Sequence, residues 1–180
     1  MKKGNIPIRQ TNESFIIKKI HSPHEKLFKQ FHKKFPAKEF VNRIRQPKET
    51  AYLAIKKGEI VAYAWVTEKE LFINEINHTY ALNKDEIFLH SCFVCKENRG
   101  KGVHLALLYE RLRDYREKDL FRRAYVGVLS FNRGSIKGVK KAGFKEMKKI
   151  RYLKWLNKEK WWGDDIIIKN TKSGRFKTIN

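Results

Sequence analysis

The stretch 86–115 constrains the fold more than any other part of this sequence. It begins with the apolar run 86–95, passes through the turn "RGKG" (99–102), and continues into a segment with leucines at helical spacing. A mostly apolar run of this length is typical of a strand in the middle of a sheet. A second strand and helix, predicted at 122–130 and 132–142, follow it directly. This order predicts a mixed α/β fold with a parallel strand pair and a right-handed crossover.

The turn itself predicts a binding site for a diphosphate. Glycines allow backbone conformations that are closed to other residues, and they let a ligand approach the main chain. The N–H groups at the start of the following helix point outward, with the positive end of the helix dipole behind them. Two nucleotide motifs are excluded, because Val103 stands where a P-loop needs Ser or Thr and Leu105 stands where a dinucleotide fingerprint needs glycine.

The remaining periodicities predict one domain over 1–170, followed by a basic, flexible tail at 171–180. In the helix after the turn we expect four apolar residues on the buried face (Leu105, Leu108, Leu112 and Tyr115) and five polar ones outside (Glu110, Arg111, Arg113, Asp114 and Arg116). Further helices are predicted at 24–35 and 37–46, each followed by proline. Further strands are predicted at 14–20, in a hairpin over 50–67 that turns at Lys57-Gly58, and at 71–82 and 144–156, the last with 164–169 as a short partner.

Charge and cysteine content limit the setting in which the chain works. It carries 41 Lys and Arg against 19 Asp and Glu, a net charge of +22, and no apolar run long enough to span a membrane. The positive charge has two explanations: an anionic partner, or a genome rich in lysine codons. The start has no apolar signal segment. Cys92 and Cys95 lie three apart in a strand and should face opposite ways, so we expect reduced thiols, no metal and a cytoplasmic location.

Two blocks together resemble the GNAT superfamily of acyl-coenzyme A-dependent N-acyltransferases. The stretch "RGKGVHL" (99–105) is similar to the superfamily's motif A in the form found in histone-type members. About thirty residues later, "SFNRGSIKGVKKAGF" (130–144) is similar to a second block of the pattern N-x-x-[SA]-x-x-x-x-x-K-x-G-F. The resemblance implies a central, mostly antiparallel sheet that parts between its two central parallel strands and is flanked by helices. It covers roughly 59–155.

The resemblance also implies the cofactor, acetyl-coenzyme A, and its contacts. Backbone amides of the turn would bind its pyrophosphate, and the parted strands would receive its pantetheine arm. Asn132 matches a position whose side chain touches that arm, and it is also a good N-cap for the helix that follows. Lys101, Arg133 and Lys137 are expected near phosphates. The full set of expected cofactor contacts is Phe93, Val94, Arg99, Gly100, Lys101, Gly102, Val103, His104, Asn132 and Ser135.

Catalytic groups are harder to assign. Family members commonly carry a proton-donating tyrosine where this chain has Val139, and valine cannot donate a proton; Tyr125 and Tyr152 are substitutes. For the base, Glu86 and His90 are four apart on one strand and should project from the same face as a water-linked pair. A solvated Glu86 and a packed His90 are the structural alternatives, and Glu75 and His78 are further candidates.

The expected activity is acetyl transfer from acetyl-coenzyme A to a primary amine, directly in a ternary complex, by a monomer or a homodimer. The positive field disfavours a basic peptide and favours a small or anionic acceptor such as an aminosugar or nucleotide sugar. Two alternatives stay open: a nucleic-acid- or anionic-surface-binding module, and an acetyltransferase that acts on aminoacyl-tRNA. The first rests on a basic cluster (Lys137, Lys140, Lys141, Lys145, Lys148, Lys149 and Arg151). No nucleic-acid-binding motif accompanies that cluster.

Overall fold

The structure is a computed structural model that describes residues 15–20, 42–43, 45–118, 120–156, 158–163, 166–169 and 176–179. Its contacts divide the chain into two compact units. The sheet unit comprises 1–69 and 83–144, and the hairpin unit comprises 70–82 and 145–180. Each is described by itself. The expected single domain over 1–170 stays a prediction.

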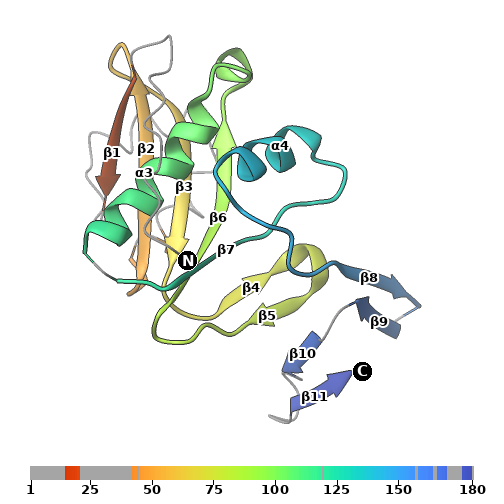
Figure 1. The fold of residues 1–180 in the computed structure, drawn as a ribbon. Coiled ribbons are helices and arrows are strands. Elements are labelled where there is room, and N and C mark those ends of the chain that lie inside the picture. The colour runs from red at the N-terminus through yellow and green to blue at the C-terminus, as the bar shows by residue number, and fades with distance from the viewer. Residues whose placement is uncertain are drawn as a thin grey trace. The chain divides into compact units, whose positions relative to one another are not determined.

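The sheet unit is built on five strands in the order β1-β2-β3-β6-β7 (Figure 1). All neighbours in it are antiparallel except β6 and β7, which run parallel. The mixed, mostly antiparallel sheet predicted from the sequence is therefore confirmed. The strands are β1 (Ile16–Ile20), β2 (Glu49–Lys56), β3 (Glu59–Thr67), β6 (Glu86–Val94) and β7 (Arg123–Val126).

The hairpin predicted over 50–67 is confirmed as β2 and β3. Its turn has Lys57 at φ 49° and Gly58 at φ 78°. Positive φ at both central residues belongs to a type I′ turn, whose twist suits a two-residue hairpin. This turn fixes the register of the two strands that lead to the centre of the sheet.

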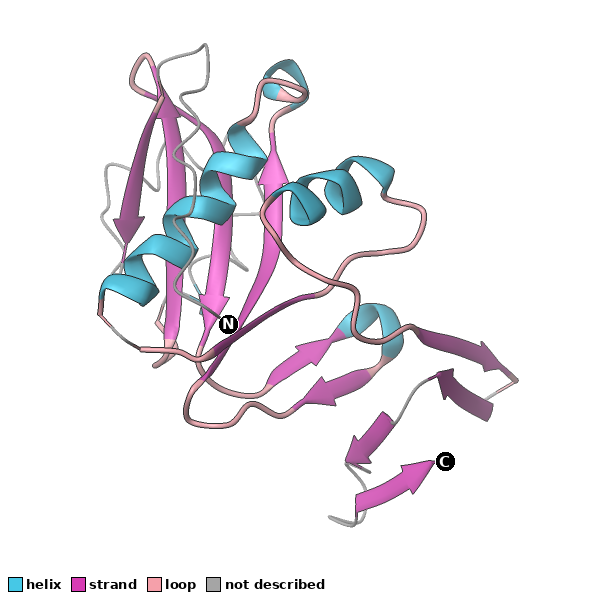
Figure 2. Cartoon of the chain, viewed as in Figure 1, coloured by secondary structure: helices cyan, strands magenta, loops and turns pink. Residues whose placement is uncertain are grey.

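Two helices, α3 (Val103–Glu117) and α4 (Arg133–Lys141), pack on one face of this sheet, and α3 crosses the strands (Figure 2). Leu108, Leu112 and Tyr115 are buried as predicted, and Val139 of α4 joins the same core cluster. Burying this apolar area is the main force that holds the helices to the sheet. A second, smaller cluster on other sheet residues contains Ile20, Ala51, Leu53, Ile60, Trp65 and Cys95.

Arg111 corrects the predicted polar face of α3. It is 1% exposed, and its guanidinium donates to the carbonyls of Leu107 (3.0 Å) and Trp65 (2.9 Å). Burial lowers its pKa. A charged side chain is tolerated in the core when its donors find acceptors, here one helix carbonyl and one strand carbonyl. The helical pattern predicted an exposed Arg111 because that prediction uses only the polarity of each residue.

Three strand predictions were wrong in their extent. The segment 71–82 is a small hairpin, β4 (Leu71–Ile73) and β5 (His78–Tyr80), joined by the 3₁₀ turn η1 (Asn74–Ile76). The segment 144–156 forms a strand only from Ile150, and the segment 122–130 only over β7. Asn77, at φ 45°, reverses the chain after η1 in the conformation that asparagine adopts more readily than most residues.

The hairpin unit therefore contains antiparallel pairs instead of an extension of the main sheet. The strand β8 (Ile150–Trp155) pairs with β9 (Lys158–Gly163), and not with 164–169 as expected. The latter region contributes β10 (Ile166–Lys169), which pairs with β11 (Phe176–Ile179) inside the segment predicted as a flexible tail. The two helices predicted over 24–35 and 37–46 lie outside the described residues, apart from Asn42 and Arg43, which are helical.

Candidate functional site

The site is built where β6 and β7 part. The two strands pair only over Glu86–Leu89 and Arg123–Val126, although β6 continues to Val94 beside β3 (Figure 1). Ser91 and Cys92 on the unpaired part are exposed, whereas residues 86–89 are buried. The second half of a central strand thus presents an open edge, which is what an extended ligand needs for β-strand-like pairing. The predicted parting of the parallel strands is confirmed.

A β-bulge lies at the start of this open edge. In the pairing of β3 with β6, Trp65 opposes His90 but Tyr63 opposes Phe93, so two residues of β6 face one residue of β3. Ser91, inside the bulge, has φ 44°. A bulge re-aims the side chains around it, which is why bulges are frequent beside active sites.

The glycine turn has the geometry of an anion-binding site. Gly100 (φ 76°) and Gly102 (φ 81°) both adopt the left-handed conformation, and the chain reaches them from β6 through the 3₁₀ turn η2 (Lys96–Asn98). Gly102 caps α3 without a side-chain hydrogen bond, and the first turn of α3 holds no acidic residue. The first N–H groups of a helix have no partner within the helix. These groups therefore suit a bound phosphate.

Arg99 ties this turn to the end of β6. Its Nε donates to the carbonyl oxygen of Val94 at 3.0 Å, and its guanidinium lies 6.0 Å from the ring centroid of Phe93. Three of the predicted cofactor contacts are thus brought together at one end of the open edge.

The second sequence block forms α4 as predicted. Asn132 is the N-cap, its Oδ1 accepting from the backbone N–H of Ser135 at 3.0 Å, and Gly143 follows the helix at φ 89°. Val139, which stands where family members commonly carry tyrosine, is 8% exposed and packs in the core. The capping role of Asn132 is confirmed, whereas its contact with a pantetheine arm stays a prediction.

His104 joins the two helices. A Cβ atom on Gly138 of α4 would lie 2.6 Å from Nδ1 of His104, so the imidazole packs directly on that glycine. Burial, together with the positive charge of Arg111, lowers the pKa of His104 to about 4. The histidine at the end of "RGKGVH" therefore has a packing role between α3 and α4.

Glu86 lies in a saturated hydrogen-bond network. It is 4% exposed, and its carboxylate accepts from Tyr125 Oη (2.9 Å) and the backbone N–H of Asn83 (3.0 Å) and forms an ion pair with Arg123 Nε (3.0 Å). Burial raises its pKa, but the hydrogen bonds from Asn83 and Tyr125 outweigh burial, so the pKa is lowered. This carboxylate joins the start of β6 to β7, and its contacts do not include His90.

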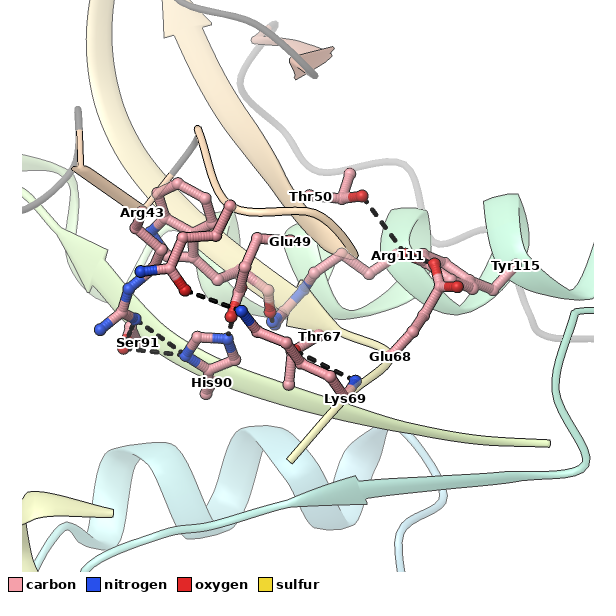
Figure 3. A network of polar contacts seen from close by, with 12 residues as sticks. Arg43, Glu49, Thr50, Thr67, Glu68, Lys69, His90, Ser91, Arg111 and Tyr115 are labelled. Carbon is pink, nitrogen blue, oxygen red and sulfur yellow. Dashed lines mark hydrogen bonds and ion pairs between the residues drawn. The ribbon is translucent and has the colours of Figure 1, made fainter. Parts of the chain in front are cut away.

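His90 has different partners, drawn in Figure 3. Its Nε2 lies 3.2 Å from Glu49 Oε2, and its Nδ1 lies 3.0 Å from Arg43 Nη1 and 3.1 Å from Ser91 Oγ. The guanidinium of Arg43 also donates to Ser91 Oγ at 2.8 Å and lies 5.6 Å from the ring centroid of Trp65. Both side chains of the His90–Glu49 pair are nearly inaccessible, with 7% and 4% exposed. The predicted water-linked pair of Glu86 and His90 is replaced by two separate networks.

Sequence reasoning missed Arg43, Glu49 and Ser91. Adjacent side chains of a regular strand point to opposite faces, so nothing in the sequence predicted that Ser91 would contact His90. The pairing of Glu49 with His90 joins segments 41 residues apart. Of the other candidates, Tyr125 is engaged by Glu86, while Glu75, His78 and Tyr152 belong to the hairpin unit. Neither Cys92 nor Cys95 forms a disulfide.

Comparison with known proteins gives the following relatives. The model of the acetyltransferase (GNAT) family matches residues 18–144. No curated protein sequence matches the chain. Among similar solved structures is the aminoglycoside N-acetyltransferase AAC(6')-Iy in complex with the bisubstrate analogue CoA-S-monomethyl-acetylneamine. It has a TM-score of 0.60 and 15% identity, with 79% of this chain and 99% of that chain covered.

Two further solved structures have the same fold. The acetyltransferase AAC(6')-Ih from Acinetobacter baumannii has a TM-score of 0.58 and 17% identity over 79% of this chain and 98% of its own. The enzyme meta-AAC0020 from an uncultured soil metagenomic sample, in complex with sisomicin, has a TM-score of 0.58. It is 12% identical over 80% of this chain and 97% of its own.

Proposed function

The chain belongs to the acetyltransferase (GNAT) family and is an acetyl-coenzyme A-dependent N-acetyltransferase, and from this premise we propose that it acetylates a small, anionic primary amine. The acetyl group passes directly to the amine in a ternary complex. The observation that carries the proposal is the open edge of β6 that leads to the glycine turn at the start of α3.

The residues of the sheet unit fit the coenzyme. The amides that follow Gly102 and the dipole of α3 favour its pyrophosphate, and the exposed cations Lys101, Arg133 and Lys137 add positive charge. The edge of β6 beyond the last pair with β7 offers main-chain groups to its pantetheine arm. When bound, acetyl-coenzyme A supplies a thioester whose carbonyl carbon accepts the amine.

An anionic acceptor is supported by the side chains at the bulge. The cation Arg43 contacts the exposed Ser91, and the carboxylate of Glu49 is already engaged by His90. The net charge of +22 attracts anions over a longer range.

None of the described helices is long and apolar enough to cross a membrane. We place the enzyme in the cytoplasm, where two cysteines that form no disulfide stay reduced.

Calorimetric titration with acetyl-coenzyme A tests the cofactor site. Gly102→Asp should abolish binding, because a carboxylate would occupy the anion site. Gly58→Asp is the matched control, since Gly58 has φ 78° against 81° for Gly102 and therefore the same backbone strain at a turn far from α3 in the sequence. Equal affinity in both variants would contradict the site. Steeply salt-dependent RNA binding without coenzyme binding would favour the nucleic-acid alternative.

The acceptor class is tested with amines that differ in charge. Glucosamine 6-phosphate and glucosamine differ only by the phosphate, and the cationic sisomicin, bound in a structurally similar enzyme, completes the series. We expect kcat/KM to be at least about tenfold higher with the phosphorylated sugar and to fall with ionic strength. A preference for sisomicin would refute the anionic acceptor but not acetyl transfer.

A further inference from the structure

A continuous chain of hydrogen bonds leads from the solvent-exposed Ser91 into the protein. Ser91 Oγ lies 3.1 Å from His90 Nδ1, and His90 Nε2 lies 3.2 Å from Glu49 Oε2 (Figure 3). A hydroxyl, an imidazole and a carboxylate in this order are the groups that proteins use to activate a hydroxyl for proton transfer. The arrangement lies at the first residues of β6 beyond its pairing with β7.

The backbone is strained at this point. Among the described residues, positive φ at a non-glycine residue occurs at Lys48, Lys57, Asn77 and Leu156, all outside strands, and at Ser91 within β6. A serine at φ 44° is uncommon, and such outliers cluster at functional sites. Because of the bulge, the hydroxyl of Ser91 reaches the imidazole of its direct neighbour, which a regular strand would prevent.

The direction of the hydrogen bonds follows from Arg43. A guanidinium can only donate, so Ser91 Oγ accepts from it at 2.8 Å and His90 Nδ1 accepts as well. The imidazole proton therefore resides on Nε2, which donates to Glu49. Nδ1 has one lone pair and lies within hydrogen-bond distance of both Arg43 and the Ser91 hydroxyl, so the hydroxyl hydrogen reaches Nδ1 when Arg43 donates to Ser91 Oγ alone.

Burial and the positive charges around His90 keep its imidazole neutral. Burial lowers its pKa, Glu49 raises it, and the positive charges of Arg43 and Arg111 lower it further, so the pKa lies below the usual value of 6.5. At neutral pH the imidazole is therefore neutral. When Nδ1 takes up a proton, the carboxylate of Glu49 stabilises the cation, and Arg43, which cannot accept from Nδ1–H, keeps only its hydrogen bond to Ser91 Oγ.

We propose that Ser91, His90 and Glu49 form a proton relay that deprotonates the acceptor amine. Ser91 Oγ takes one proton from the amine nitrogen while its own hydrogen moves to His90 Nδ1, which becomes an imidazolium held by Glu49. Acetyl transfer releases coenzyme A as a thiolate, and the relay then returns this proton to the sulfur to give the free thiol. Ser91 and His90 are the catalytic residues and Glu49 is a positioning residue. The relay rests on the proposed acetyl transfer and assigns the base to a group other than Glu86.

The first test needs no turnover. In protein with ¹⁵N-labelled histidine, NMR should show His90 as the Nε2–H tautomer, with a pKa below 6.5. Glu49→Gln should lower that pKa further, because the carboxylate is the group that raises it. An Nδ1–H tautomer, or a pKa that Glu49→Gln leaves unchanged, would overturn the relay.

The second test separates the hydroxyl from the strain. Ser91→Ala and Ser91→Gly both remove the hydroxyl, but glycine relieves the strain at φ 44° and should raise the melting temperature relative to alanine. With glucosamine 6-phosphate as acceptor, we expect kcat to fall about a hundredfold in both variants. The acetyl-coenzyme A affinity should stay unchanged, and the loss should be smaller at high pH. If kcat of the two variants differs in the same order as their melting temperatures, or if both variants keep the kcat of the parent enzyme, the relay is overturned.

Two further outcomes have separate meanings. A mass increase of one acetyl group on Ser91 after incubation with acetyl-coenzyme A would show a serine nucleophile and would refute the relay. If the unmodified enzyme acetylates none of the amines tested, the proposed function fails, whereas the tautomer and the pKa of His90 still decide the order of the hydrogen bonds.

Discussion

The contact between His104 and Gly138 gives a sharp test of how α3 and α4 pack. Replacing Gly138 by alanine has two opposing effects on stability. Alanine favours the helix by about 1 kcal/mol, because glycine loses more backbone freedom on folding. The new Cβ would lie 2.6 Å from Nδ1 of His104, closer than Cβ atoms approach other atoms in proteins, and 3.0 Å from Cε1. Displacing an imidazole held between two helices costs about 1–3 kcal/mol.

The double-mutant cycle separates the two effects. Gly138→Ala alone should lower the free energy of unfolding by about 1 kcal/mol, whereas in a His104→Ala background it should raise it by about 1 kcal/mol. The coupling energy is then about 2 kcal/mol, which is typical of residues in direct contact. Urea titrations followed by circular dichroism measure all four proteins. A stabilising Gly138→Ala of equal size in both backgrounds would refute the proposed packing of His104 on α4.

Three further perturbations probe the same unit. The pKa of His104 is about 4 in the folded protein against 6.5 in the unfolded chain, so the unfolded state binds more protons between these values. Stability should therefore fall as the pH drops from 6.5 to 4, by up to about 3 kcal/mol, and thermal denaturation of His104→Gln should lack this part of the loss. Asn132→Ala removes the cap on Ser135 and should lower the free energy of unfolding by about 1 kcal/mol in urea denaturation. Gly138→Ala destabilises the same helix by a similar amount but keeps Asn132, so a larger loss of acetyl-coenzyme A affinity in Asn132→Ala would indicate contact with the arm, and an equal or smaller loss would indicate capping alone. Val139→Tyr overpacks the core and should lower the melting temperature; if kcat nevertheless rises, protonation of the leaving thiol limits the parent enzyme.

The sequence was most informative where one local signal fixes one conformation. The turn at Lys57-Gly58 needs positive φ at both residues, and the glycines at 100 and 102 need it as well; all four adopt it. Asn132 and Gly143 define the ends of α4 through capping geometry. The strand that precedes the glycine turn is recognisable because a buried central strand is apolar on both faces. The parted sheet and the cofactor were predicted from the resemblance of the two motif blocks to a known superfamily.

The catalytic side could be decided only by the tertiary structure. A bulge in β6 turns Ser91 toward its neighbour His90, and one extra residue cannot be recognised in the sequence of a strand that is apolar on both faces. Glu49 meets His90 through strand order, which depends on how distant segments pair. Arg111 is buried because its donors find carbonyl oxygens in the fold, and sequence periodicity contains no information about such partners. Local backbone conformations could therefore be predicted from this sequence. The polar networks around His90 and Arg111 could not, because they depend on contacts between residues far apart in the chain.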